Sequence, residues 1–116
     1  MANKKYELID ETWQANEASV RELFSDLEDK DSSFKEEDYE GELGAGWKIK
    51  TAESFGGEGQ GDERWVVIEL IDPSNNSTYW EIPGWYQSNY GSEFTIRETF
   101  QVEAKEVKVI KWFPVK

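Results

Sequence analysis

Carboxylates set among aromatic residues are the side chains of this sequence that most resemble parts of a catalytic site. Glu69, Glu81 and Glu93 each lie in or beside a segment rich in aromatic residues. A glycosidase needs two carboxylates at a set separation across a sugar-binding cleft, and this group contains candidates for such a pair. Acidic residues are so frequent, at 25 in 116 residues, that a pair carries little information. We interpret these three as outward-facing or edge carboxylates and assign no catalytic residue.

The chain contains no histidine and no cysteine. Histidine is the commonest general base and the commonest metal ligand, and Ser–His or Cys–His catalysis requires one of these two residues. The lack of cysteine also excludes disulfides and thiolate chemistry, which suits a reducing cytoplasm. We therefore expect a non-enzymatic protein without a metal site or a cofactor.

The glycine-rich segment Gly56–Glu63 resembles a ligand-binding loop at first sight. A phosphate loop would need a lysine and a serine or threonine, whereas Glu58, Asp62 and Glu63 would repel an anion. The acidic residues also lack the spacing of a calcium loop. We interpret the segment as a hairpin loop. The alternative is a loop ordered by a partner, with Glu58 and Asp62 as contact residues.

Aromatic residues are dense between positions 80 and 90, where they are interleaved with small polar residues. The candidates for partner contact are Trp80, Trp85, Tyr86 and Tyr90. Amphipathic rings of this kind are enriched at protein–protein interfaces and also line sugar sites. Two alternatives stay open, namely that half of these rings fill the core of the sheet or that at least two of them are exposed for binding. Direct nucleic-acid binding is not expected, because a basic surface is missing.

Acidic residues are concentrated in the first half of the chain. Residues 1–63 have a net charge of −11, against −1 in residues 64–116. The segment 17–42 alone has a net charge of −8 and includes Glu36, Glu37 and Asp38. Such a surface repels nucleic acid and anionic membranes and attracts basic surfaces. The charges are either simply solvated or arranged to imitate the phosphate row of DNA.

A helix is predicted over Asn16–Asp29. Four apolar residues recur there at the helical period, on one stripe: Val20, Leu23, Phe24 and Leu27. Asn16 is a good N-cap, and Glu17 lies favourably at the positive end of the helix dipole. Upstream, residues 2–12 predict a short strand or a docking arm.

From Trp47 onward the pattern changes to the alternation of apolar and polar residues that is typical of strands. We predict strands at 47–55, 65–71, 78–82, 94–102 and 105–113, with residues 85–90 as a short strand or an extended loop. Glycines at 41–46 are expected to break the chain before this region, and Pro83 to end the third strand. Trp47, Ile49 and Phe55 are expected to share one face.

The expected fold is a single α+β domain of residues 1–116, with residues 47–116 as its β-rich core. Residues 65–71 are apolar on both faces, which indicates a central strand. Connections this short favour antiparallel neighbours. We therefore predict an N-terminal helix packed on a curved antiparallel sheet of about five strands.

Three features resemble a group of small acidic bacteriophage proteins of unknown function. They are a Gly-Glu-Gly loop before a strand within residues 54–65, a Gly-aromatic-Tyr-x-Ser turn within 84–91, and a closing basic-apolar strand at 106–112. The resemblance covers residues 47–113. It implies an accessory protein that acts inside an infected bacterium by binding host or phage proteins. No functional residue is assigned in the group, so none is transferred.

The leading hypothesis is a non-enzymatic protein that binds another protein through the aromatic segment or the glycine-rich loop. One alternative is a DNA-mimic inhibitor of a nucleic-acid-binding protein, acting through segment 17–42. The other is a carbohydrate-binding module that uses the aromatic cluster 80–90. Without a secretory signal or a long apolar run, we expect a cytoplasmic protein that does not bind membranes. An exposed edge strand would allow a homo-oligomer.

Overall fold

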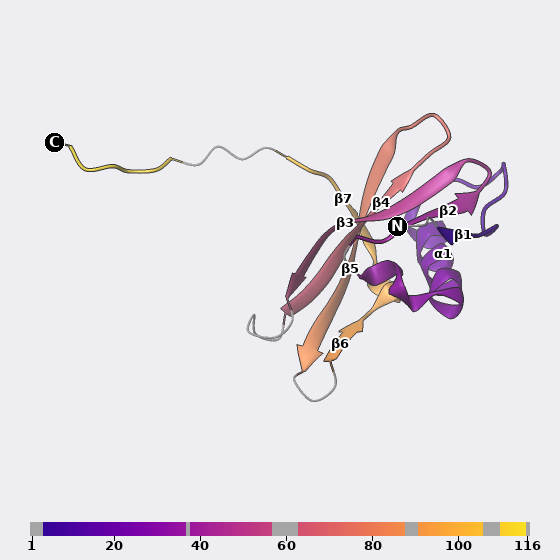
Figure 1. Cartoon of the computed structure of the whole chain (residues 1–116), viewed down its shortest axis with the longest axis horizontal. Helices are drawn as coiled ribbons and strands as arrows, with labels where there is room; N and C mark the ends of the chain where they lie inside the picture. The colour runs from indigo at the N-terminus through magenta and orange to yellow at the C-terminus, as the bar shows by residue number, and fades with distance from the viewer. Residues whose placement is uncertain (1–3, 37, 57–62, 88–90, 106–109, 116) are drawn as a thin grey trace.

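The computed structural model describes residues 4–36, 38–56, 63–87, 91–105 and 110–115. Over these residues, helix α1 (Glu17–Lys30) packs on a seven-stranded sheet (Figure 1). The strands are β1 (Lys4–Lys5), β2 (Glu40–Gly44), β3 (Trp47–Gly56), β4 (Glu63–Ile71), β5 (Ser77–Gln87), β6 (Gly91–Phe94) and β7 (Phe100–Val102). Two 3-10 helices, η1 (Ser32–Lys35) and η2 (Ile96–Glu98), complete the described elements.

The predicted α+β class is confirmed. The sheet has seven strands rather than about five, and it is mixed because β1 runs parallel to β2. The other strand pairs are antiparallel, as the short connections predict.

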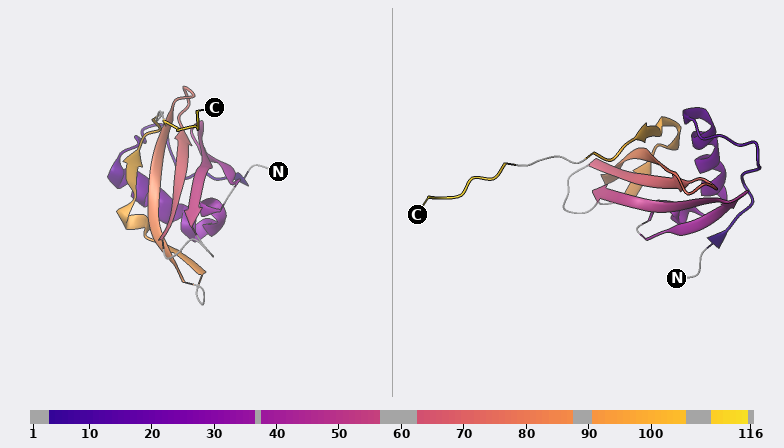
Figure 2. Two further views of the ribbon diagram at one scale, coloured as in Figure 1. Left: turned by 90° about the vertical axis from the view of Figure 1, so that its left-hand side faces the viewer. Right: turned by 90° about the horizontal axis from the view of Figure 1, so that it is seen from above.

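Helix α1 begins directly after its predicted N-cap. The Asn16 side chain accepts a hydrogen bond from the Ser19 N–H at 2.9 Å, and the Asn16 N–H donates to the Ser19 hydroxyl at 2.9 Å. This reciprocal capping box satisfies two N–H groups that lack a helical partner. The predicted apolar stripe is buried against one face of the sheet. Figure 2, left, shows β3, β4 and β5 in front of α1.

Strand β4 is the central strand that the sequence predicts. It pairs along its length with β3 on one side and β5 on the other. Val66, Ile68 and Leu70 are fully buried on the face covered by α1. Because strand side chains alternate, the residues between them lie on the opposite face.

A bulge in β3 reverses the side on which its last residues lie. Ile49 and Thr51 pair with β4 residues that face α1, whereas Glu53 pairs with a β4 residue of the opposite face. The register shift between Thr51 and Glu53 inserts one residue, so every later side chain changes face. The prediction that Trp47, Ile49 and Phe55 share one face is therefore wrong for Phe55.

Strand β5 continues through Pro83, where the sequence predicts its end. The Pro83 carbonyl accepts a hydrogen bond from the Thr95 N–H at 2.8 Å, on the outer side of β5. The N–H that proline lacks would point to that same side. There, β7 pairs with β5 before Pro83, β6 pairs with β5 after it, and η2 lies between the two. The predicted single strand 94–102 is therefore wrong, because these residues contain the last residue of β6, the 3-10 helix η2 and the short edge strand β7.

The N-terminal arm (residues 4–9) docks along β2, as one of the two predicted alternatives. The N–H groups of Tyr6, Leu8 and Ile9 donate to the β2 carbonyls of Glu42 and Leu43 at 2.8–3.0 Å. Strand β2 itself is not predicted, because glycines usually weaken strands. A side-chain carbon at Gly41 would lie 3.3 Å from a carbonyl oxygen of the arm, so glycine allows this close approach.

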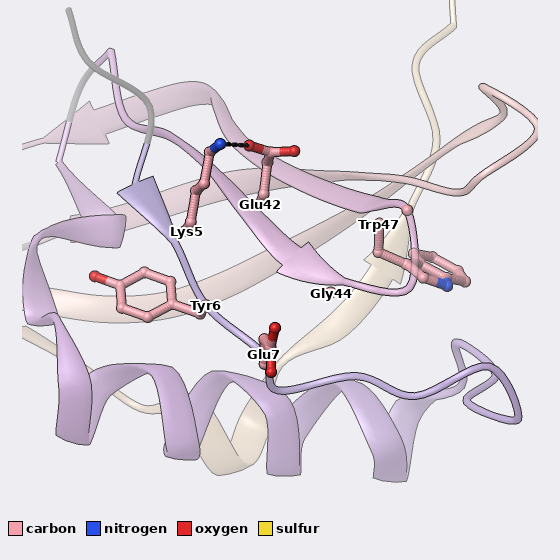
Figure 3. A pocket seen from close by; sticks show the side chains of 7 residues that line it. Lys5, Tyr6, Glu7, Glu42, Gly44 and Trp47 are labelled. Carbon is pink, nitrogen blue, oxygen red and sulfur yellow. Dashed lines mark ion pairs between the residues drawn. The ribbon is translucent and has the colours of Figure 1, made fainter.

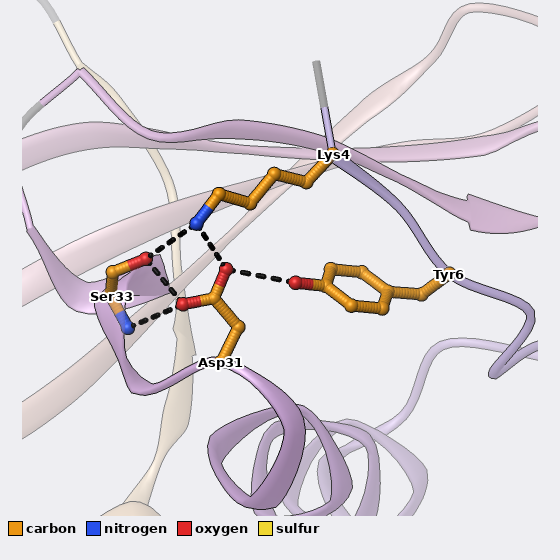
Figure 4. A network of polar contacts seen from close by, with 4 residues as sticks. All are labelled: Lys4, Tyr6, Asp31 and Ser33. Carbon is orange, nitrogen blue, oxygen red and sulfur yellow. Dashed lines mark hydrogen bonds and ion pairs between the residues drawn. The ribbon is translucent and has the colours of Figure 1, made fainter. Parts of the chain in front are cut away.

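Asp31, the C-cap of α1, ties the helix to this arm (Figure 4). Its Oδ2 accepts hydrogen bonds from the Lys4 ammonium at 2.6 Å and the Tyr6 hydroxyl at 2.8 Å. The N–H of Ser33 donates to Oδ1 at 3.1 Å. The hydrogen bond from Lys4, followed by those from Ser33 and Tyr6, holds the pKa of the Asp31 carboxyl well below its usual range.

The predicted C-terminal strand Lys105–Phe113 is not formed by the described residues. Lys105 and residues 110–113 have no secondary structure, and residues 106–109 lie outside the described residues. The last described strand is β7, which ends at Val102. Beyond it, the described residues extend away from the sheet (Figure 1).

Candidate protein-binding surface

No described element covers the face of the sheet opposite α1, and this face mixes aromatic and aliphatic side chains with charged ones. We call it the open face. Strand pairing places on it the apolar and aromatic residues Phe55, Trp65, Val67, Ile71, Tyr79, Trp85 and Phe100, together with the charged residues Lys48, Lys50, Glu53, Glu63, Glu69, Glu81 and Glu93. An antiparallel sheet with one solvated face normally has polar residues on that side. Here β4 places Trp65, Val67 and Ile71 on it. The open face therefore has the composition of a contact surface.

Aromatic side chains dominate the open face. Phe55 of β3 and Trp65 of β4 are direct cross-strand partners, and their rings stack with centroids 5.1 Å apart and an interplanar angle of 10°. Phe55, Trp85 and Phe100 are 36%, 38% and 39% exposed. Large rings that combine a fixed position with such exposure are typical anchors of protein–protein interfaces.

Trp85 lies between two carboxylates. Its cross-strand partners are Glu63 of β4 and Glu93 of β6, and all three side chains are exposed. Direct cross-strand neighbours have Cβ atoms about 5 Å apart. A cation placed over the indole ring would therefore be attracted by the ring and by both carboxylates. This end of the open face favours a basic group next to an apolar one.

The two carboxylates nearest the middle of this face have different environments. Glu69 forms an ion pair with Lys50 at 3.6 Å and accepts a hydrogen bond from the Ser77 hydroxyl. Glu81 lies opposite Val67 of β4 and Phe100 of β7. Burial, and to a lesser extent the charge of Glu63, raises the pKa of the Glu81 carboxyl above its usual value. A cationic partner would relieve the cost of keeping this carboxylate charged.

The structure separates the predicted aromatic contact residues. Trp80 is 2% exposed and belongs to the core, so its prediction as a contact residue is wrong. Its indole N–H donates to the Thr78 hydroxyl at 2.9 Å. Trp85 lies on the open face, whereas Tyr86 is half-buried and points to the opposite face by strand alternation. Tyr90 lies outside the described residues.

The predicted acidic contact residues are not brought to the aromatic ones. Glu36 and Asp38 are exposed in the connection between η1 and β2. In the strand order, β3 and β4 separate β2 from β5, which holds Trp85. Glu37 lies outside the described residues, as do Glu58 and Asp62 of the glycine-rich loop.

Phe55, Trp65 and Phe100 are open-face residues that the sequence analysis does not select as contacts. Trp65 had a local signal, since residues 65–71 are apolar on both faces. That pattern indicates a central strand, and β4 is one, but the described elements that cover the sheet, α1 with η1 and η2, lie on one side of it. Phe55 reaches this face only because of the β3 bulge, which the alternation pattern does not indicate.

Apart from the open face, a depression lies beside the N-terminal arm (Figure 3). It is lined by Lys5, Tyr6, Glu7, Glu42, Gly44, Gly46 and Trp47. Gly44 has φ +98°, and a side-chain carbon there would lie 2.9 Å from the Ile9 carbonyl oxygen. Lys5 and Glu42 form an exposed ion pair at 3.9 Å. We assign this depression no ligand.

No family model matches the chain, and neither a curated protein nor a solved structure matches it. Within the described residues, no group of three or more acidic side chains is arranged to hold a metal ion. Of the helices described, none is long and apolar enough to cross a membrane.

Proposed function

We propose that the protein is a non-enzymatic module that binds another protein through the open face. The observation behind this proposal is the uncovered aromatic surface on β3, β4, β5 and β7, with Phe55, Trp85 and Phe100 each more than one-third exposed. Exposed apolar patches of this kind mark interaction sites on soluble proteins. A partner that buries the three rings would gain the anchoring that aromatic residues provide at interfaces.

The charges around the patch define the chemistry of the partner. Glu63 and Glu93 flank Trp85, and Glu81 lies between apolar residues. A partner with apolar side chains next to lysine or arginine would match this arrangement. The resemblance of residues 47–113 to phage proteins supports a host or phage protein in an infected bacterium as this partner.

Affinity capture with variants of the full chain tests this function. We expect Trp85→Ala combined with Phe100→Ala to lose the bound protein at both low and high salt. The matched control is Glu22→Gln combined with Asp26→Asn on the outer side of α1, which should retain it. The proposal is wrong if the open-face variant captures the same protein as the parent chain.

A DNA mimic is the second candidate function, and one observation favours it. Glu22, Asp26 and Asp29 are all exposed along α1, where their spacing of four and three residues puts them on one side of the helix. A basic groove would bind such a row electrostatically, and the interaction would weaken steeply with added salt. In the same capture experiment this function predicts the reverse result, namely loss of the partner with the α1 variant.

A further inference from the structure

The described end of the chain exposes a run of large apolar side chains. Ile110, Trp112, Phe113 and Val115 are 78%, 90%, 79% and 98% exposed. The radius of gyration of 16.6 Å exceeds the roughly 13 Å expected for a compact chain of this length, in keeping with an end that does not pack on the body. Apolar side chains concentrated in this way mark an interaction site, and the described residues of the same chain do not cover them.

We propose that residues 110–115 of one copy bind the open face of a second copy. This inference rests on the proposed function, because it names a partner for the same surface. Two copies that exchange these segments reciprocally would form a closed dimer, in which each open face is covered by the end of the other chain.

Charge complementarity supports this occupant. Residues 105–116 contain four lysines and one glutamate and have a net charge of +3, whereas residues 1–104 have a net charge of −15. Within the proposed binding segment 110–115, Lys111 is the one charged residue, and it lies between Ile110 and Trp112. On the open face, Glu63 and Glu93 flank Trp85 in the same mixture of apolar and acidic groups. The segment therefore has the chemistry that the surface favours.

The dimensions are also compatible. Residues 110–115 have no helical structure, and six extended residues span at most about 20 Å. Neighbouring strands are about 4.8 Å apart, so the apolar part of β3, β4, β5 and β7 is roughly 14 Å wide. Figure 1 shows the segment on the side of the sheet away from α1, which is the side of the open face. A second copy can therefore receive it without displacing the helix.

Sedimentation of the full chain over a range of concentrations tests the proposal. We expect a reversible dimer that weakens with salt. Two variants should each raise the dimer dissociation constant by at least about tenfold: Trp112→Ala with Phe113→Ala in the segment, and Trp85→Ala with Phe100→Ala on the open face. The Glu22→Gln and Asp26→Asn control should dimerise like the parent chain.

Mixing the two variants gives the sharpest result. The segment variant retains an intact open face and the open-face variant retains an intact segment, so the mixture should regain one of the two contacts and form a heterodimer. A mixture that stays monomeric overturns the proposal, as does a full chain that is monomeric at every concentration. The proposal is also overturned if Trp112 is protected from a fluorescence quencher to the same degree at every protein concentration, because the segment would then bind its own chain.

The outcome is separable from that of the proposed function. If the full chain is monomeric but the open-face variant still loses a captured protein, only the self-association is wrong. If the open-face variant both dimerises and captures like the parent chain, the open face is not the binding surface and both proposals fail.

Discussion

The two faces of the sheet contain similar apolar residues but differ in what packs on them. On one face, Val66, Ile68, Leu70, Trp80 and Ile82 are buried with the apolar stripe of α1. On the other face, Phe55, Trp85 and Phe100 remain more than one-third exposed. Apolar composition alone therefore does not distinguish a core from a binding surface. The difference is that the described elements cover one face, where α1 packs, and leave the other face open.

The largest effect is expected at Trp80. This ring is 2% exposed and fills space between the sheet and α1. Trp80→Ala should lower the free energy of unfolding by about 3–5 kcal/mol, because it removes buried apolar area and leaves a cavity. Urea denaturation measures this loss. A change below about 1 kcal/mol would contradict the assignment of Trp80 to the core.

A smaller loss is expected at Asp31, which ties α1 to the arm. Asp31→Asn should cost about 1–2 kcal/mol, because hydrogen bonds to a charged group are lost. The folded-state pKa of Asp31 lies below its unfolded value. Its contribution is therefore present above about pH 4 and is lost as the pH falls further. Denaturation as a function of pH should show a shallower acid dependence in Asp31→Asn than in the parent chain.

The other end of the same helix gives a related test. Asn16→Ala removes the side chain that caps the first turn of α1. The expected cost is about 1 kcal/mol. Chemical denaturation with Asn16→Asp as a control should show the loss only for alanine, since aspartate also caps well. An equal loss of free energy of unfolding in both variants would show that the Asn16 cap does not stabilise α1.

Trp85→Ala should leave stability almost unchanged. Trp85 is on the same strand as Trp80 but is 38% exposed on the open face. We expect a change within about 0.5 kcal/mol in the free energy of unfolding. Measured beside Trp80→Ala by the same denaturation method, this pair compares one residue type on the two faces. A loss as large as that of Trp80→Ala would show that the open face is part of the core.

The finest test is the ionisation of Glu81. Its pKa is raised by burial and by Glu63, so its carboxylate should titrate above the usual value of about 4.3. The charge on Glu81 therefore opposes folding above its folded-state pKa, and this cost disappears as the pH falls below its unfolded value. Side-chain carbon NMR measures the pKa directly. Glu63→Gln should lower it, and the binding of a cationic partner should lower it further.

Local patterns predicted the elements whose signals are contained within a few residues. The i, i+3, i+4, i+7 stripe and the Asn16 cap locate α1, and the apolar run at 65–71 identifies β4 as central. In both cases the physical cause acts between near neighbours in the sequence. The density of aromatic residues does not distinguish exposed Trp85 from buried Trp80, because the alternation along β5 decides which face each residue joins.

Features that depend on distant contacts were not predictable in the same way. Gly41 and Gly44 allow the N-terminal arm to approach β2 closely. The outer edge of β5 pairs with two separate strands, β6 and β7, because Pro83 has no N–H to donate on that side. Neither effect is visible without the neighbouring segment.

By itself, the sequence determined a helix with one apolar side, a strand apolar on both sides and a strongly acidic chain, since these follow from residue types and their period. The tertiary structure decided which apolar residues are buried beneath α1 and which are exposed on the open face. One extra residue at the β3 bulge moves Phe55 from the side of α1 to the open side. The reason is geometric, because side chains alternate along a strand and register is set by pairing with β4 rather than by the residue's own neighbours.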